Sequence, residues 1–303
     1  MYASVEGGRM RFYIAVRHKG VWRVAERLYD EKAWSALLSR AEREVLEAIR
    51  GTVTKALEKL GRPAMVEEPK EKVDERGKVK GYYLLLYSRH LASFLECAAE
   101  RVKAEPAEVR LEGRNIVMKV GGVKAEVEFK LLKCGEAEFL LAKDVEQTLA
   151  LYKSLKALGV PVEIMPKGVK INSKAMWALV ATAVEKAIEH GGVSKWPAKV
   201  MPDVKLLKVY SIGNTRMYVF RAEDTQYYFA VKTEQGWRTA GGKYSGGKVK
   251  VAGESVPIIA DAINVIYRER GVERRVEVKY DKKGVPYIKL TNVDLRLLGL
   301  TRP

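Results

Sequence analysis

Three parts of the chain repeat one layout, and this repetition limits the possible folds more than any other feature. Each part begins with an amphipathic helix pattern, apolar at positions i, i+3, i+4 and i+7, and the pattern ends at a glycine. Two strand-like runs with a glycine turn between them follow. The closing glycines are Gly61, Gly159 and Gly271, and the turn glycines are Gly77, Gly168 and Gly284. A closing glycine fits the left-handed residue that commonly ends a helix.

Strand-like runs also precede each of the three helices. They are "MRFYIAV" and "VWRVAERLY", then "NIVMKV" and "AEVEFKLL", then "RMYVFRAE" and "QYYFAVKT". The repeating unit is therefore strand, strand, helix, strand, strand, often with a further helix. The closing glycines are 98 and then 112 residues apart, which indicates domain duplication rather than a short solenoid repeat. The alternative is that such joints recur by chance in α+β proteins.

This layout predicts the α+β class, with antiparallel sheets covered on one face by helices and free on the other. We expect a first α+β unit over residues 1–104, a second over 105–192 and a C-terminal unit over 204–303. Residues 193–203 carry prolines after a glycine pair and are the predicted linker.

The charge of the chain favours a polyanionic partner. Its 303 residues contain 55 Lys and Arg against 38 Asp and Glu, a net charge of +17. Such an excess is typical of contact with nucleic acid or an anionic membrane surface, although it also serves solubility. Gln occurs three times and Asn five times. Scarce thermolabile amides beside abundant Lys, Arg and Glu indicate a heat-adapted, thermophilic protein.

Several classes of protein are not expected. No apolar run reaches 18 residues and no basic-then-apolar leader is present, so we predict no membrane contact and a cytoplasmic location. Cys97 and Cys134 are too few for a zinc site or a disulfide framework, although one bridge between them is left open. The oligomeric state, and whether the chain is part of a longer protein, are also left open.

One short stretch has the spacing of a phosphate-binding loop. Gly242–Lys248 reads G-x-x-x-x-G-K. A true phosphate-binding loop needs a Ser or Thr directly after the Lys, because that hydroxyl binds Mg²⁺. A helix must follow, so that its N-terminus faces the phosphate. Val249 stands there instead, and "KVKV" alternates as a strand does. We therefore predict a turn between strands and no nucleotide cofactor.

Basic residues around this turn are the first candidate binding site. Arg238, Lys243, Lys248 and Lys250 lie between Gly236 and Val251 with no acid among them. They are expected to contact phosphates, and Trp237 and Tyr244 to stack on bases. The alternative is a flexible hairpin whose Trp packs inward. A second basic group completes the predicted site: Arg274, Arg275, Lys279, Lys282 and Lys283.

The sequence predicts no catalytic residue and no metal site. His18, His90 and His190 are the only histidines, and none has metal-ligand spacing with another His or Cys. The element order resembles half of a LAGLIDADG homing endonuclease, whose saddle-shaped sheets bind DNA. The nearest matches to its motif are "LASFLECAA" (91–99) and "WALVATAVE" (177–185), with Glu96 on the first acid. The family's metal-binding acid falls on Ala98 and Val184, so the resemblance implies a scaffold that binds DNA without cutting it.

A second resemblance covers the C-terminal third most clearly. "GWRTAGGK" (236–243), "ADAINVIYRERGVERRVEVKY" (260–280) and "YIKLTNVDLRLLGL" (287–300) are similar to the archaeal Pa-repeat proteins of type two-b. These are multicopy proteins of hyperthermophilic crenarchaea with no established activity, so the resemblance implies no functional residue. Our leading hypothesis is a non-catalytic protein that binds nucleic acid, with double-stranded DNA as the expected partner. The alternatives are a Mg²⁺-dependent endonuclease using Glu96, Glu100 or Glu185, and a functionless paralogue or protein-interaction module.

Overall fold

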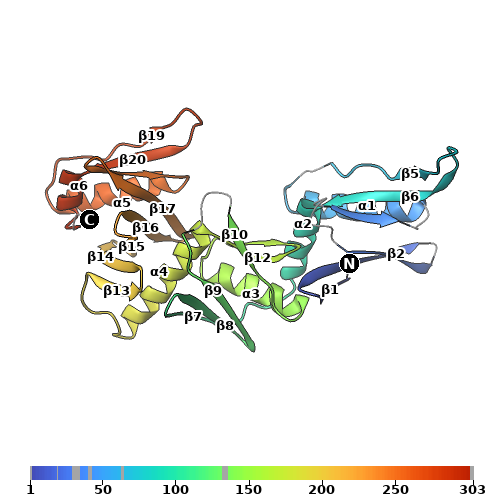
Figure 1. Ribbon diagram of the computed structural model, residues 1–303, viewed down its shortest axis with the longest axis horizontal. Coiled ribbons are helices and arrows are strands. Elements are labelled where there is room, and N and C mark those ends of the chain that lie inside the picture. The colour runs from blue at the N-terminus through green and yellow to red at the C-terminus, as the bar shows by residue number, and fades with distance from the viewer. Residues whose placement is uncertain are drawn as a thin grey trace. The chain divides into compact units, whose positions relative to one another are not determined.

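A computed structural model describes residues 2–18, 20–28, 35–39, 43–62, 65–131 and 136–300. The helices are α1 (Arg43–Lys59), α2 (Ser88–Ala99), α3 (Val145–Ala157), α4 (Ser173–Glu189), α5 (Val256–Glu269) and α6 (Asn292–Leu297). The strands are β1 (Tyr2–Glu6), β2 (Arg9–His18), β3 (Val21–Leu28), β4 (Ser35–Ser39), β5 (Lys70–Val73), β6 (Val79–Tyr87), β7 (Ala107–Glu112), β8 (Asn115–Val120), β9 (Val123–Glu128), β10 (Ala137–Leu140), β11 (Glu163–Met165), β12 (Gly168–Asn172), β13 (Ala198–Met201), β14 (Val204–Ile212), β15 (Thr215–Ala222), β16 (Gln226–Thr233), β17 (Gly236–Ser245), β18 (Lys248–Ala252), β19 (Lys279–Tyr280) and β20 (Pro286–Thr291). The predicted α+β class is confirmed (Figure 1).

The chain divides into two compact units with interleaved sequence. Unit 1 comprises residues 1–105, 139–154 and 163–170, and unit 2 comprises residues 106–138, 155–162 and 171–303. Four residues of the stretch expected to be a linker, Ala198–Met201, form strand β13 at the edge of a large sheet in unit 2. Among the helices that the structure describes, none combines the length and the apolar character that a membrane span requires.

Unit 1 contains two three-stranded antiparallel sheets with helices packed on them. The strand orders are β1-β2-β3 and β4-β6-β5. Helix α1 turns an apolar stripe inward, with Leu46, Ile49 and Val53 fully buried. Leu84 and Leu86 alternate along β6 to meet the same core, which helix α2 extends with Leu91. The i, i+3, i+4 pattern of the helices and the two-residue period of the strand thus converge on one core.

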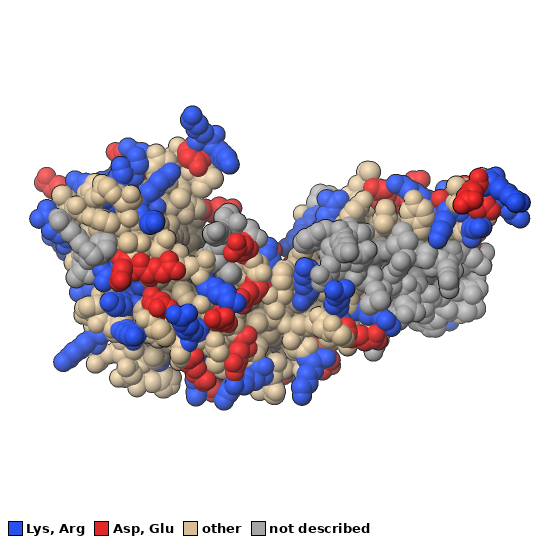
Figure 2. All heavy atoms as spheres, viewed as in Figure 1, with Lys and Arg blue, Asp and Glu red and all other residues tan. Residues whose placement is uncertain are grey.

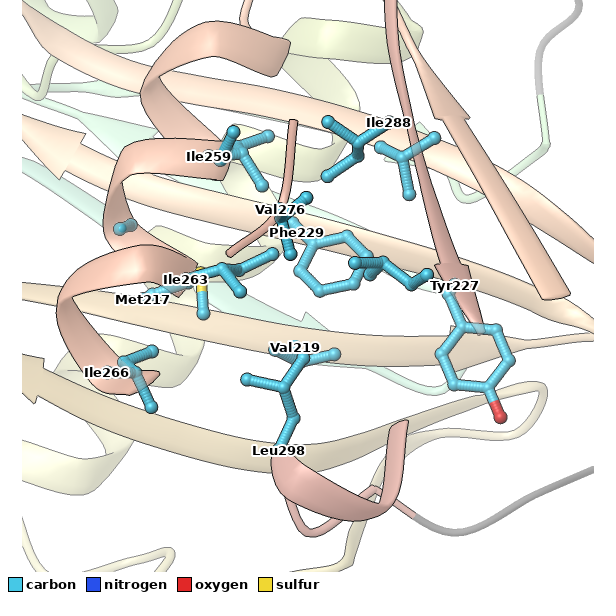
Figure 3. Packing of buried hydrophobic residues seen from close by; sticks show 14 of the residues in the cluster. Met217, Val219, Tyr227, Phe229, Ile259, Ile263, Ile266, Val276, Ile288 and Leu298 are labelled. Carbon is cyan, nitrogen blue, oxygen red and sulfur yellow. The ribbon is translucent and has the colours of Figure 1, made fainter. Parts of the chain in front are cut away.

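Unit 2 is built around an eight-stranded antiparallel sheet. Its order is β13-β14-β15-β16-β17-β18-β20-β19, and a separate sheet has the order β7-β8-β9. Helix α5 covers one face of the large sheet, where Ile259 and Ile263 pack over Phe229 and Val219 (Figure 3). Strand residues of alternating position, including Val249 and Ile288, complete this core.

The middle of the large sheet is covered on its other face too, which corrects the expectation of a single covered face. Helix α4 contacts β16 and β17 there. Its Trp177 stacks on Tyr228 of β16 with ring centroids 3.9 Å apart, and Phe220 of β15 lies beside the same ring at 5.6 Å. The sequence contains the reason. "MYVF" in β15 and "YYFAV" in β16 are continuous apolar runs, which are typical of strands buried on both faces.

The helix–glycine–hairpin joints are confirmed at all three places. Gly61, Gly159 and Gly271 have φ values of +63°, +78° and +68°. In each case the next residue donates its N–H to a carbonyl in the last helical turn: Arg62 to Leu57 at 3.0 Å, Val160 to Leu155 at 3.0 Å, and Val272 to Tyr267 at 2.9 Å. The strand orders also agree, as β4-β6-β5, β10-β12-β11 and β18-β20-β19. The layout therefore recurs, while duplication as its origin stays a hypothesis.

Candidate nucleic-acid interface

Five lysines lie on one surface at the β19 edge of the large sheet, and we call this surface the lysine face. It consists of Lys243 (β17), Lys248 and Lys250 (β18), Lys279 (β19) and Lys289 (β20), all exposed. Strand alternation creates it. The intervening residues of β18 and β20, such as Val249 and Leu290, point into the core beneath α5 and are fully buried. Their neighbours therefore point to the opposite face.

The sheet register aligns these lysines across the strands. Lys250 pairs directly with Lys289, and Lys248 with Thr291. Tyr244 pairs with Val249, so Lys243 lies beside Lys250 on the other side. Cross-strand neighbours have Cβ atoms only about 5 Å apart, and like charges at that spacing are destabilising. A row of three lysines across three strands thus costs stability unless an anion lies against it.

One aromatic side chain partly relieves this repulsion. Tyr287 is the β20 residue two positions before Lys289 and points to the same face. Its ring centroid is 4.4 Å from Nζ of Lys250 and 5.7 Å from Nζ of Lys289. The negative face of an aromatic ring attracts a nearby ammonium group. Lys279 pairs with Tyr287 on the next strand and extends the lysine face to the sheet edge.

The lysine face lacks the ion pairs found over other surfaces. Within the described parts of the chain, no acidic side chain lies within ion-pair distance of its five lysines. Elsewhere, cations sit against carboxylates, as in Lys130–Glu138 at 2.7 Å, Lys174–Glu254 at 2.6 Å and Arg114–Asp203 at 2.8 Å. Figure 2 shows this mixture of both signs over much of the described surface. The five lysines therefore form one group of like charges without acidic partners in the described part of the chain.

One carboxylate that senses the charge of Lys250 is occupied by its own turn. Asp281 follows β19, and its Oδ1 accepts the backbone N–H groups of Lys283 at 2.8 Å and Val285 at 2.9 Å. These two hydrogen bonds, together with Lys250 and Lys283, hold the pKa of Asp281 below its usual value. The carboxylate orders the hairpin that carries Lys282 and Lys283, both exposed.

The structure thus brings together four of the predicted residues, Lys243, Lys248, Lys250 and Lys279, with Lys282 and Lys283 on the adjoining hairpin. Sequence reasoning missed Lys289 and Tyr287. The alternation in "PYIKLT" could have indicated both, because it places Tyr and Lys on the face opposite Ile288 and Leu290.

Neither predicted aromatic residue is available to stack on a base. Trp237 is 1% exposed and packs edge-on against Tyr218 at 5.6 Å, on the α4 side of the sheet. Its backbone N–H donates to Gly159 at 2.8 Å, which holds β17 close to the glycine that closes α3. Tyr244 packs against the α5 core and donates its hydroxyl to Asn292 at 2.9 Å. These two roles are corrected, and the alternative of an inward-packed Trp is right.

The predicted arginines are not part of the lysine face. Arg274 binds Asp294, with Nε 2.6 Å from Oδ1 and a second nitrogen 3.1 Å from Oδ2. Asp294 is 1% exposed, so Arg274 neutralises a buried charge, and the expected phosphate contact is corrected. Arg275 is exposed and borders a cavity with Asn264 and Arg268. Arg238 is half-buried and donates to Gln235 at 2.9 Å.

The Gly-Lys stretch is a turn between strands, as predicted. Ser245 pairs with Lys248, so Gly246 and Gly247 form a two-residue hairpin turn with φ values of +55° and +76°. Both residues of such a turn need positive φ, which glycine adopts without steric cost. A strand, not a helix, follows the turn.

The acids considered for a nuclease site are all paired with cations. Glu96 lies 2.8 Å from Arg62, Glu100 lies 3.1 Å from Lys59, and the buried Glu185 lies 2.6 Å from Lys232. The described residues contain no group of three or more His, Cys, Asp or Glu able to hold a metal ion. Cys97 is a free thiol, whereas Cys134 lies outside the described residues.

Comparison with protein-family models, with curated proteins and with solved structures finds no match for this chain.

Proposed function

We propose that this is a non-catalytic, cytoplasmic nucleic-acid-binding protein and that its lysine face contacts the phosphate backbone. One observation carries the proposal: five exposed lysines share a sheet face on which no described acid pairs with them. Lysines that merely serve solubility need not gather five to one sheet face, where cross-strand neighbours repel one another. A polyanion lying across the strands removes that repulsion and releases its own counterions.

The geometry favours a backbone contact over sequence reading. Lysine ammonium groups on a sheet surface reach phosphate oxygens as point charges, and phosphate contacts position a protein without reading sequence. Phosphates occur in duplex and single strands alike, so the lysine face alone does not distinguish them. Double-stranded DNA stays the partner expected from the sequence.

Binding of a labelled 20-nucleotide DNA, as duplex and as single strand, over a salt series tests the proposal. Neutralising about five phosphates predicts a fall of log affinity with log salt of slope about −4.5 for duplex DNA. Lys250→Glu/Lys289→Glu should lower affinity by roughly 10–100-fold at low salt and make the slope shallower by about 2.

A matched control exists on the opposite edge of the same sheet. Lys199 of β13 and Lys205 of β14 are exposed and pair directly across the strands. Lys199→Glu/Lys205→Glu therefore makes the same change in net charge at another cross-strand pair. Equal losses in the two double variants would mean that only net charge matters and would refute the lysine face. Absence of binding even at low salt would refute nucleic-acid binding altogether.

A further inference from the structure

A cavity of about 360 Å³ adjoins the lysine face within unit 2. Strands β16, β17 and β18 form its floor, and the first residues of α4 form one wall. Two of its lining residues belong to the cross-strand rows of the lysine face. Gln226 pairs with Lys243, and Ala252 pairs with Tyr287. A chain whose phosphates lie on the lysine face therefore passes the mouth of this cavity.

Close packing shapes part of the cavity wall. Gly241 and Gly242 lie on its floor, where neither position has room for a side chain. A Cβ atom at Gly241 would come within 2.4 Å of the Tyr228 ring, and one at Gly242 within 2.0 Å of the Lys250 carbonyl oxygen. The Tyr228 ring thus lies directly over Gly241, and Trp177 stacks on it at 3.9 Å with the planes 20° apart. This packing forms the space before any ligand enters.

The polar groups of the cavity suit a nucleobase better than a phosphate. Its lining contains one carboxylate, Glu136, which would repel an anion, and one ammonium group, Lys174. Glu254 is paired with Lys174 at 2.6 Å. Gln226 has no hydrogen-bond partner for its amide among the described residues, and it offers one donor beside one acceptor. That pair matches the edge of a base, as in the bidentate contact of Gln with adenine.

We propose that the cavity receives one unpaired nucleobase of the nucleic acid bound on the lysine face. The proposal rests on the proposed function and adds the form of its ligand. A base inside an intact duplex is stacked and cannot enter such a cavity, so the nucleotide must be single-stranded or extruded from its helix. The protein then prefers unpaired over fully paired nucleic acid, with Gln226 contacting the base edge.

The test compares a single-stranded 20-mer with its duplex, using the wild-type chain and three variants. Gln226→Leu keeps the size of the side chain and removes its amide, whereas Gln226→Glu keeps its shape and adds a charge. Gln147→Leu is the matched control, because Gln147 is also half-buried but lies on α3 in unit 1. We expect single strands to bind at least about tenfold tighter than duplex, since each accommodated base adds to the phosphate contacts. Gln226→Leu should remove most of this preference and leave duplex binding unchanged.

Uncharged nucleosides test the cavity independently of the lysine face. Adenosine and thymidine titrated at millimolar concentration should shift the NMR signals of Gln226 and Tyr228 in the wild-type chain, and should leave the Tyr228 signals of Gln226→Leu unshifted. Equal affinity for single strand and duplex, with no nucleoside binding, would overturn the base cavity while leaving phosphate binding intact. Nucleoside binding without any oligonucleotide binding would support the cavity and overturn the proposed function instead.

Discussion

The β5–β6 and β19–β20 hairpins have the same turn and different surfaces. In each, an aspartate closes the turn by accepting two backbone N–H groups on one oxygen. Asp74 accepts from Arg76 at 3.0 Å and from Lys78 at 2.9 Å, and Asp281 accepts in the same pattern from residues two and four positions later. The following glycines, Gly77 and Gly284, have φ values of +75° and +76°. The turn chemistry therefore fixes the hairpin whatever the other side chains are.

The charges on these hairpins differ. On the β5–β6 hairpin two lysines pair with acids, with Lys70 2.6 Å from Glu67 and Lys80 3.9 Å from Asp74. The β19–β20 hairpin carries Lys279, Lys282 and Lys283 and adjoins the lysine face, and Figure 2 shows basic side chains projecting from its tip. One hairpin geometry thus occurs with lysines paired to acids and with lysines that lack acidic partners among the described residues. This difference in exposed residues, rather than the fold, is why we propose the β19–β20 hairpin and not the β5–β6 hairpin as a polyanion contact.

The helices that follow the two hairpins begin with different capping groups. At the start of α2, the Tyr87 N–H donates to Nδ1 of His90 at 3.2 Å, whereas at the start of α6 the Thr291 N–H donates to Asp294 at 2.7 Å. Both capping side chains are buried, His90 at 0% and Asp294 at 1% exposure. A neutral imidazole needs no counter-charge there, but a buried carboxylate needs Arg274.

The largest expected effect at neutral pH is the loss of that counter-charge. Arg274→Ala leaves the Asp294 carboxylate with hydrogen bonds from Thr291 and Tyr267 only. Breaking a buried pair typically costs about 3–5 kcal/mol, and water can replace part of this partner because the Arg274 side chain is 44% exposed. We expect the free energy of unfolding to fall by about 2–3 kcal/mol in urea titrations. Arg275→Ala, at the exposed neighbour, is the control, and equal stability of the two variants would contradict the pairing.

Arg274 and Arg275 show what could be read from the sequence and what could not. Helix–glycine–strand joints and strand alternation are local, so the elements, their caps and the basic strand residues were predictable. The partner of Arg274 lies 20 residues away in a different element, and only the packed fold brings it within 2.6 Å. Trp237 was misjudged for the same reason, because α4, more than 45 residues earlier, covers its face of the sheet.

The second effect is a dependence of stability on pH in unit 1. Burial, with a smaller effect from Arg89, lowers the pKa of His90 from 6.5 to about 4. The unfolded chain therefore binds more protons than the folded chain between these values. The contribution of His90 is complete above pH 6.5 and is lost as pH falls towards 4, by up to about 3 kcal/mol. For Asp294, burial alone would raise the pKa, but hydrogen bonds from Arg274, Thr291 and Tyr267 hold the pKa below 3.8. The contribution of Asp294 to stability is therefore lost only in stronger acid than that of His90.

Urea unfolding between pH 4 and 7 checks this difference between the two capping groups. His90→Asn keeps an acceptor for the Tyr87 N–H but does not titrate, so its stability should change less with pH than that of the wild-type chain. His190→Asn, at an exposed position, should leave the pH profile unaltered. A wild-type profile that is flat from pH 6.5 to 4 would exclude the neutral, buried imidazole.

A smaller effect concerns binding at the two hairpin tips. Lys282→Glu/Lys283→Glu should weaken nucleic-acid affinity by roughly tenfold at low salt, as expected when about one to two phosphate contacts are lost. Arg76→Glu/Lys78→Glu makes the same change in charge on the β5–β6 tip and should leave affinity nearly unchanged. Fluorescence anisotropy at matched salt measures both. A similar loss of affinity at both tips would mean that the β5–β6 hairpin also contacts the nucleic acid.

The smallest effect is local order within the turns. Asp281→Ala removes the acceptor for the Lys283 and Val285 N–H groups, and Asp74→Ala does the same for Arg76 and Lys78. Both turns are exposed, so we expect several-fold faster hydrogen exchange at these amides with little change in the unfolding transition.

Only Asp281→Ala should also alter binding, because the ordered turn holds Lys282 and Lys283 beside the lysine face. Losing the carboxylate also removes a negative charge there. Asp281→Asn, which removes the charge and keeps an acceptor, therefore separates turn order from electrostatics: weaker binding in Asp281→Ala but not in Asp281→Asn would show that the order of the turn matters.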